Sequence, residues 1–333
     1  MSLHRRPMRS GDVLQGASLL RTHPCFEPQY RKTGDALQTA WIKCLGREAF
    51  QAIVLEEKCG ANSRMLGVGV FVFVRQVFLE RAKQPPFFWL GPELAKEIVS
   101  GDDPLLSDED VRRSNATGSL NLVAWPMSMP PEDMGRPDVA NFMVSSVVEG
   151  IRGYRIQEIV AQTPVPEEAH ATMLTGLSLL HRRGVQDKVG LEELRTIVRS
   201  PHVLFLTKEA AMTRVGAWSS TMFLTPEPRI GFSRCEQLLM TEALHAGTDE
   251  ELAARRCVSV SAVKKAWKSI YRRVVDAQVE LGLDSDHHLE TGDRGKQKKQ
   301  LVLGYVREHP EELRPVDMRY VTSEAERQQK AAD

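Results

Sequence analysis

The chain has 333 residues, of which 42 % are hydrophobic, and it carries 44 basic and 44 acidic residues. This length allows one or two domains with ordinary cores, and the composition excludes a disordered tail, a collagen-like chain and a small disulfide-linked scaffold. Because the charges balance, an electrostatic preference for a partner must come from a local patch. Five cysteines without a C-x-x-C pair predict neither a disulfide framework nor a zinc site, and they favour the cytoplasm.

No segment has the length and apolar character of a membrane span. The most apolar stretch, residues 65–74, is shorter than the ~20 residues that cross a bilayer, and Arg75 ends it. The arginines near the start of the chain are not followed by the apolar run of a signal peptide. We therefore expect a cytoplasmic chain with no membrane partner.

The first two thirds of the chain have the pattern of a mixed α/β domain. Residues 68–74 predict a strand buried on both faces, because neither set of alternate positions is polar. Weaker strand patterns occur at residues 50–55, 120–125, 155–161 and 203–207, and amphipathic helices are predicted at 137–149 and 166–183. We expect residues 1–224 to form one mixed α/β domain, sensory or acetyltransferase-like.

One motif in this domain is typical of an enzyme. Residues Arg64 to Gly69 have the R-x-x-G-x-G spacing of acetyltransferases, whose backbone amides hold the pyrophosphate of coenzyme A at a helix N-terminus. In that family the motif follows a strand and opens a helix, whereas here it leads into the strand of residues 68–74. A turn before a strand is the favoured interpretation, and an acyltransferase-like enzyme with a helical appendage is the alternative function.

The character of the sequence changes at residues 225–231. Pro226 and Pro228 can neither continue a helix nor donate to a strand ladder, so we place a linker there. The pattern is then helical to about residue 283. Residues 284–333 are polar and basic and predict a C-terminal tail with one short helix at 300–308.

Local signals divide residues 232–275 into three helices. Ser233 can cap the first helix, and Thr248 with Glu251 has the spacing of a capping box for the second. Ser259 or Ser261 can cap the third, because the hydroxyl-rich run before it is poor helix interior.

The third helix is predicted to be strongly amphipathic. Val263, Trp267, Ile270 and Val274 form one apolar stripe. The other positions include five cations and no acid: Lys264, Lys265, Lys268, Arg272 and Arg273. An α-helix fits the major groove of DNA, and cationic side chains gain affinity there by displacing counterions.

These residues resemble the helix-turn-helix of LuxR/FixJ-type transcriptional regulators. Residues 251–253 (E-L-A) stand at the family's E-I-A, residues 258–259 (V-S) at its I-S, and residues 261–264 (S-A-V-K) at its S-T-V-K. The resemblance implies an all-α DNA-binding domain at residues 232–283. The residues it assigns to the DNA-binding site are Ser259, Ser261, Lys264, Lys265, Ala266, Lys268 and Arg272. Ala266 departs from the polar residue often found at its position.

The sequence therefore predicts an α+β chain, with a mixed α/β domain followed by an all-α LuxR-like helix-turn-helix domain. The predicted function is that of a transcriptional regulator, not an enzyme, which binds double-stranded DNA and whose first domain receives an unknown signal, with a small-molecule effector as one candidate. A homodimer is expected because one short helix reads few base pairs. We predict no catalytic residues, metal ligands or cofactor.

Overall fold

The computed structural model describes residues 2–22, 27–59, 62–133, 135–181, 184–187, 189–196, 201–214, 218–244, 248–277 and 294–321. The chain forms two compact units. Unit 1 comprises residues 1–114, 118–151 and 156–224, and unit 2 comprises residues 115–117, 152–155 and 225–333. Helices and a mixed sheet confirm the predicted α+β class. In the described part of the chain, no helix is both long and apolar enough to cross a membrane.

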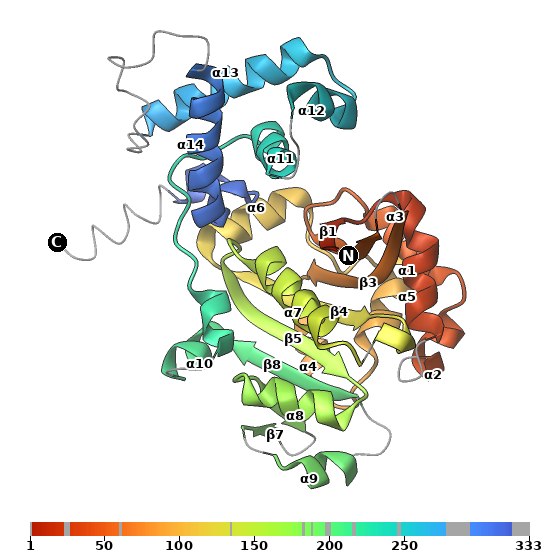
Figure 1. Cartoon of the computed structure of the whole chain (residues 1–333). Helices are drawn as coiled ribbons and strands as arrows, with labels where there is room; N and C mark the ends of the chain where they lie inside the picture. Colours follow the sequence, from red (N-terminus) through yellow and green to blue (C-terminus); the bar gives the residue numbers. More distant parts are fainter. Residues whose placement is uncertain are drawn as a thin grey trace, which may run out of the picture. The chain divides into compact units, whose positions relative to one another are not determined.

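Unit 1 is built on one eight-stranded sheet (Figure 1), with the order β1-β2-β3-β4-β5-β8-β6-β7. The strands are β1 (Ser2–Pro7), β2 (Phe50–Cys59), β3 (Asn62–Phe73), β4 (Leu120–Ser128), β5 (Ile156–Thr163), β6 (Ser178–His181), β7 (Gly184–Gln186) and β8 (His202–Thr207). Neighbouring strands are antiparallel except β4 and β5, which are parallel. The chain crosses between these two strands through helix α7 (Pro137–Ile151).

The most apolar sequence forms the centre of the sheet. Strand β3 is buried from Met65 to its end, which confirms the strand predicted at 68–74, but the strand begins earlier, at Asn62. The R-x-x-G-x-G segment therefore lies inside β3 and is not a turn before a strand. It pairs with β2, which explains the difference, because strand pairing extends the structure beyond the apolar run.

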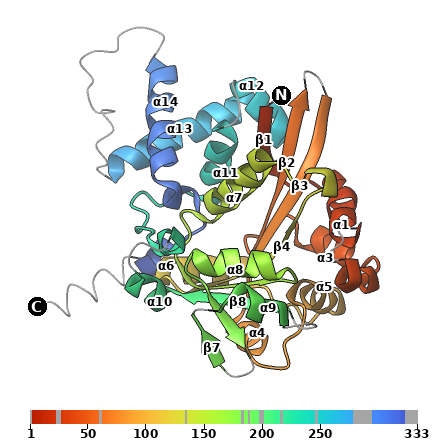
Figure 2. The same ribbon diagram turned by 60° about the horizontal axis from the view of Figure 1, so that its bottom comes forward.

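Helices cover both faces of the sheet (Figure 2). Along β3, a Cβ on Gly16 of α1 (Val13–Thr22) would meet Val68 at 3.0 Å, whereas Gly67 and Gly69 face Met143 and Val147 of α7. Since successive residues of a strand point to opposite faces, α1 and α7 lie on opposite sides. Helices α3 (Ala36–Cys44) and α5 (Leu90–Ser100) pack with each other, and each contacts α1 or the sheet.

The remaining helices of unit 1 connect the strands. They are α2 (Glu27–Tyr30), α4 (Gln76–Lys83), α6 (Asp108–Thr117), α8 (Pro166–Leu174), α9 (Leu191–Thr196) and α10 (Lys208–Thr213). The helix predicted at 166–183 is wrong in its second half. Helix α8 ends at Leu174 because Gly176 has a φ of 116°, a conformation that a helix cannot include, and the chain then enters β6.

Unit 2 contains the three helices expected from the sequence, α11 (Arg234–Ala243), α12 (Asp249–Arg256) and α13 (Val260–Asp276), followed by α14 (Arg294–Glu308). Trp267 is 4 % exposed and shares a core with Val263, Ile270, Val274 and residues of the other three helices. Helix α14 begins earlier than the predicted 300–308. Residues 278–293 and 322–333, which include much of the predicted tail, lie outside the described residues.

Candidate functional site

The parallel strands β4 and β5 separate part of the way along their length. Their ladder runs from Leu120 to Val123 on β4 and from Ile156 to Val160 on β5. Both strands continue beyond it, to Ser128 and Thr163, and there each is paired on its outer edge only, β4 with β3 and β5 with β8. Among the described residues, the two inner edges therefore face each other without a ladder.

A β-bulge lies in the part of β4 that pairs with β3 but not with β5. Trp125 is opposite Val70 of β3, but Ser128 is opposite Val68, so Gly69 faces two residues of β4 instead of one. One of these two residues is Pro126, which has no backbone N–H to donate to a ladder. A bulge of this kind bends a strand and is frequent beside functional sites. The sequence of β4 therefore favours its separation from β5.

The two glycines of the R-x-x-G-x-G segment make room for α7. A Cβ on Gly67 would lie 2.8 Å from the Ser128 carbonyl oxygen and 2.9 Å from Met143 of α7. A Cβ on Gly69 would lie 3.3 Å from Ile53 and 3.5 Å from Val147. These glycines lie in the middle of a strand, so their contacts are with a helix and a neighbouring strand, and the pyrophosphate role that the motif has in acetyltransferases does not apply to them.

Two polar side chains of β5, Glu158 and Gln162, bind helices α4 and α5. Gln162 accepts a hydrogen bond from the Leu90 amide (2.8 Å) and donates one to the Phe88 carbonyl (2.7 Å). Glu158 is buried and bonds the Lys83 ammonium at 3.0 Å, and burial raises the pKa of the Glu158 carboxyl above its usual value. Glu158 is the only acid among the residues of β4 and β5.

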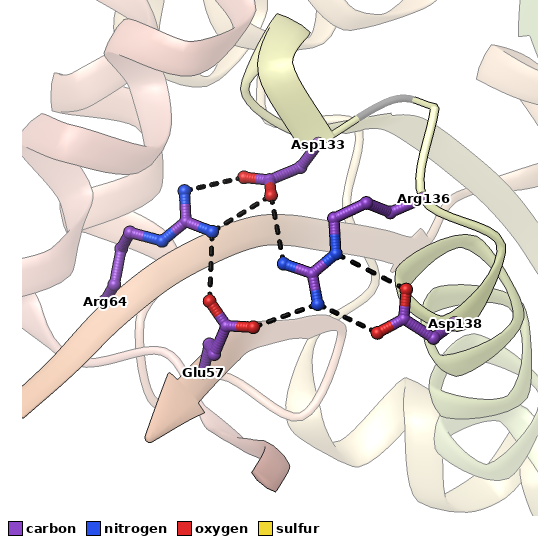
Figure 3. A network of polar contacts seen from close by, with 5 residues as sticks. All are labelled: Glu57, Arg64, Asp133, Arg136 and Asp138. Carbon is purple, nitrogen blue, oxygen red and sulfur yellow. Dashed lines mark hydrogen bonds and ion pairs between the residues drawn. The ribbon is translucent and has the colours of Figure 1, made fainter. Parts of the chain in front are cut away.

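Five charged side chains form a network at the start of α7 (Figure 3). Arg64 of β3 donates to both oxygens of Asp133 (2.8 and 2.9 Å) and to Glu57 of β2 (3.0 Å). Arg136 contacts Glu57 at 2.9 Å, Asp138 at 2.8 Å and Asp133 at 3.3 Å. The Asp133 side chain is 3 % exposed. The guanidiniums thus connect two strands to the loop and helix that follow β4.

Hydrogen bonds from the arginines favour the ionised forms of Glu57 and Asp138. Arg136, and then Arg64, hold the pKa of Glu57 below its usual value. Arg136 lowers the pKa of Asp138 as well, with smaller contributions from the backbone amides of Val139 and of Asp138 itself. Pro137, the first residue of α7, has no N–H. The Asp138 carboxylate therefore lies beside the amides of Asp138 and Val139, whereas the Ala140 amide bonds the Arg136 carbonyl oxygen at 3.0 Å.

A helix N-terminus is an ordinary place to bind a phosphate, because its free amides and its dipole attract an anion. The start of α7 does not fit the diphosphate of coenzyme A. The carboxylates of Glu57, Asp133 and Asp138 already bind the guanidiniums of Arg64 and Arg136, and the Asp138 carboxylate lies beside the amides of Asp138 and Val139. The inner edges of β4 and β5 are the part of the site that is available for a ligand with amide groups.

The residues predicted to bind DNA all lie on α13 or, in the case of Ser259, at its N-cap. Ser259 caps the helix by accepting from the Ala262 amide at 3.1 Å, whereas Ser261 is exposed within the first turn. Lys264, Lys265, Lys268 and Arg272 are exposed, and Ala266 is half-buried. The structure therefore brings the predicted residues together on one helix, without testing what they contact.

The charged network was not predicted from the sequence. Glu57 and Arg64 are seven residues apart on the hairpin of β2 and β3, but Asp133 lies 69 residues beyond Arg64, and only the loop before α7 brings it to them. A local signal does exist near α7, since Asp133, Arg136 and Asp138 occur within six residues around Pro137. This local pattern predicts the start of a helix with nearby acids, but it does not predict that Glu57 and Arg64 contact them.

No protein-family model and no curated protein matches the chain. Solved structures that match include a chimeric form of spermidine N-acetyltransferase SpeG from Vibrio cholerae, with 12 % identity over 64 % of this chain and 100 % of the other, and a TM-score of 0.37. Another is the spermidine/spermine N-acetyltransferase SpeG from Vibrio cholerae in complex with manganese ions, with 12 % identity, 64 % and 96 % coverage, and a TM-score of 0.33. Similarity this low transfers neither a site nor a substrate to this chain.

These comparisons contradict the function predicted from the sequence. The matching structures reported above are those of enzymes, and they agree with the acyltransferase alternative instead of a DNA-binding transcriptional regulator. The predictions that the chain is not an enzyme and that its partner is double-stranded DNA are corrected as well, and the homodimer stays a prediction. The physical reason for the error is that a basic amphipathic helix with good caps has the same local sequence whatever it contacts.

Proposed function

We propose that unit 1 is an acyltransferase that takes its acyl group from a thioester on an extended arm with amide groups. The observation that carries this proposal is the separation of β4 and β5 after Val123 and Val160. Each inner edge there offers backbone N–H and C=O groups, and an extended molecule with amides can pair with such an edge as an added strand does. In this proposal the thioester lies where the two strands begin to separate.

The transfer itself is a displacement at the thioester carbon. The nitrogen of an amine acceptor forms a bond to the acyl carbon, the carbon–sulfur bond breaks with its electron pair on sulfur, and the proton of the amine ends on the thiol. Backbone amides beside the separation can hold the acyl oxygen, on which negative charge develops. The products are an amide and a free thiol.

Glu158 is the candidate for accepting the proton from the amine. It lies on β5 two residues before the ladder ends and bonds the Lys83 ammonium at 3.0 Å, and burial raises the pKa of its carboxyl, which makes the carboxylate a stronger base. Replacement Glu158→Gln should lower the turnover rate by about 10²-fold or more and remove the acidic limb of its pH profile. The exposed neighbour Gln157→Ala should change neither. An unchanged pH profile in Glu158→Gln would show that this carboxyl is structural.

The proposal is tested by mixing the full chain with acetyl thioesters and a panel of amines that includes spermidine, and by measuring thiol release and the acylated amine. Hydrogen exchange supplies a second readout. Bound donor should slow the exchange of the amides of residues 124–125, 127–128 and 161–163, and should leave the edge strand β7 unchanged. Absence of both thiol release and protection would reject the acyltransferase function.

A further inference from the structure

The end of β4 and the start of α7 are joined by a short segment. Strand β4 ends at Ser128 and α7 begins at Pro137, and the described residues between them form a single 3-10 turn at Pro131–Asp133. An arm that follows the inner edge of β4 toward its carboxyl end therefore runs toward this segment. The side chains around this segment therefore determine which group the far end of the donor can carry. This inference rests on the proposed function.

The charges at that place are unfavourable for an anion. Glu57, Asp133 and Asp138 contribute three negative charges, and Arg64 and Arg136 contribute two positive ones, so the network has a net charge of about −1. Arg64 already donates through both terminal nitrogens, and Arg136 through all three of its guanidinium nitrogens. A diphosphate would have to displace these carboxylates.

The displacement is costly because part of the network is buried. Asp133 and Glu57 have side chains that are 3 % and 7 % exposed, and each is held by both guanidiniums. Removing the partners of a buried charge leaves it without compensation, which is strongly destabilising. By contrast, Asp138 is 57 % exposed and contacts only Arg136 among the arginines of the network. Asp138 is therefore the carboxylate to remove in an experiment.

We propose that the acyl donor of this protein is a pantetheine-type thioester without a diphosphate, because the carboxylates of Asp133 and Asp138 occupy the position at the start of α7 where the diphosphate of coenzyme A would bind. Two kinds of acyl donor have this amide arm and thioester in common. One is a small pantetheine thioester, and the other is a phosphopantetheine arm attached to a carrier protein. In both cases the acyl group passes to the amine and the arm leaves as its free thiol.

The test compares three donors with the same acetyl group: acetyl-pantetheine, acetyl-coenzyme A and the acetylated phosphopantetheine arm of a carrier protein. We expect at least a tenfold higher kcat/KM for one or both donors without a diphosphate than for acetyl-coenzyme A, and the better of the two identifies the source. Calorimetric titration with pantetheine and with coenzyme A gives a readout that does not depend on turnover.

Variants connect the preference to the network. Asp138→Asn should strengthen coenzyme A binding about tenfold and leave pantetheine binding unchanged. Asp12→Asn is the matched control, since Asp12 is also an arginine-bound acid of unit 1, held by Arg6 at 2.6 and 2.8 Å, but it lies far along the chain from α7. A wild-type preference for coenzyme A, or equal gains for both ligands in Asp138→Asn, would overturn the inference while leaving the proposed function intact. Failure of all three donors would instead reject the acyltransferase function, and this inference with it.

Discussion

Helix α13 of unit 2 and helix α7 of unit 1 begin in different ways. Helix α13 starts with a neutral cap, Ser259, and has no acid in its first turn. Helix α7 starts with Pro137 and Asp138 and is bound to two strands through Arg64 and Arg136. The start of α13 is thus determined by neighbouring residues, whereas the surroundings of α7 depend on residues brought together by the sheet. The charge at a helix start is therefore a property of the fold as much as of the local sequence.

The largest expected loss of stability is that of Trp267→Ala in unit 2. Removing a buried indole should destabilise the helices α11 to α14 by about 3–5 kcal/mol, because Trp267 packs in their shared core and lies beneath the Lys299 ammonium, 5.2 Å from its ring. Hydrogen exchange of α13 measures the loss. The exposed Lys265→Ala is the control and should change stability by less than about 0.5 kcal/mol. Native-like protection in Trp267→Ala would show that the core does not depend on this ring.

The same contrast explains what could be predicted from the sequence. The three helices of unit 2 were predicted because Ser233, Thr248 and Ser259 cap them and because the apolar stripe of α13 has the helical period. The strand at 68–74 was predicted from its apolar run and the helix at 137–149 from its apolar stripe, and the structure has β3 ending at Phe73 and α7 ending at Ile151.

Other elements carry little local signal. Strand β1 has the sequence S-L-H-R-R-P and is a strand because it pairs with β2 along its whole length, while Arg6 bonds Glu56 and Asp12. The separation of β4 from β5 depends on a parallel pair whose members are brought together by a helix crossover. Such non-local pairings leave no periodic pattern in either segment. The fold of unit 1 and its candidate site could therefore be predicted only in part.

In unit 1, Gly67→Ala tests whether the glycines of β3 serve to pack α7. A Cβ there would lie 2.8 Å from the Ser128 carbonyl, which is backbone, so we expect a loss of about 1–3 kcal/mol in thermal or denaturant unfolding. Gly304→Ala in α14 of unit 2 is the matched control with the opposite sign. Nothing lies within 4 Å of its Cβ, so the change should stabilise the helix by about 0.5–1 kcal/mol. A neutral Gly67→Ala would mean that α7 adjusts freely.

Replacement Ser259→Ala sharpens the comparison of the two helix starts. The hydroxyl accepts from the Ala262 amide at 3.1 Å, and losing a cap of this kind costs about 1 kcal/mol. Denaturant unfolding followed through α13 measures the change. Ser261→Ala removes a hydroxyl from the same turn that does not cap the helix, and it should have little effect. Equal losses in both variants would show that the cap does not determine where α13 begins.

The smallest expected effect is a pH dependence that belongs to the sheet of unit 1. His202 begins β8 opposite Thr163 of β5, is 2 % exposed, and burial lowers the pKa of its imidazole below the usual value. As the pH falls below about 6.5, the unfolded chain gains a proton that the folded chain does not take, so stability decreases until the pH reaches the lowered pKa of the folded state. His202→Gln should remove this acid-dependent loss from the unfolding free energy of unit 1, whereas His170→Gln, at a half-buried position of α8, should retain it.

The outcome that would contradict this prediction is a loss of stability on acidification in both variants that equals the loss in the natural chain. The buried imidazole would then not be its source, because a neutral amide at position 202 has no proton to gain.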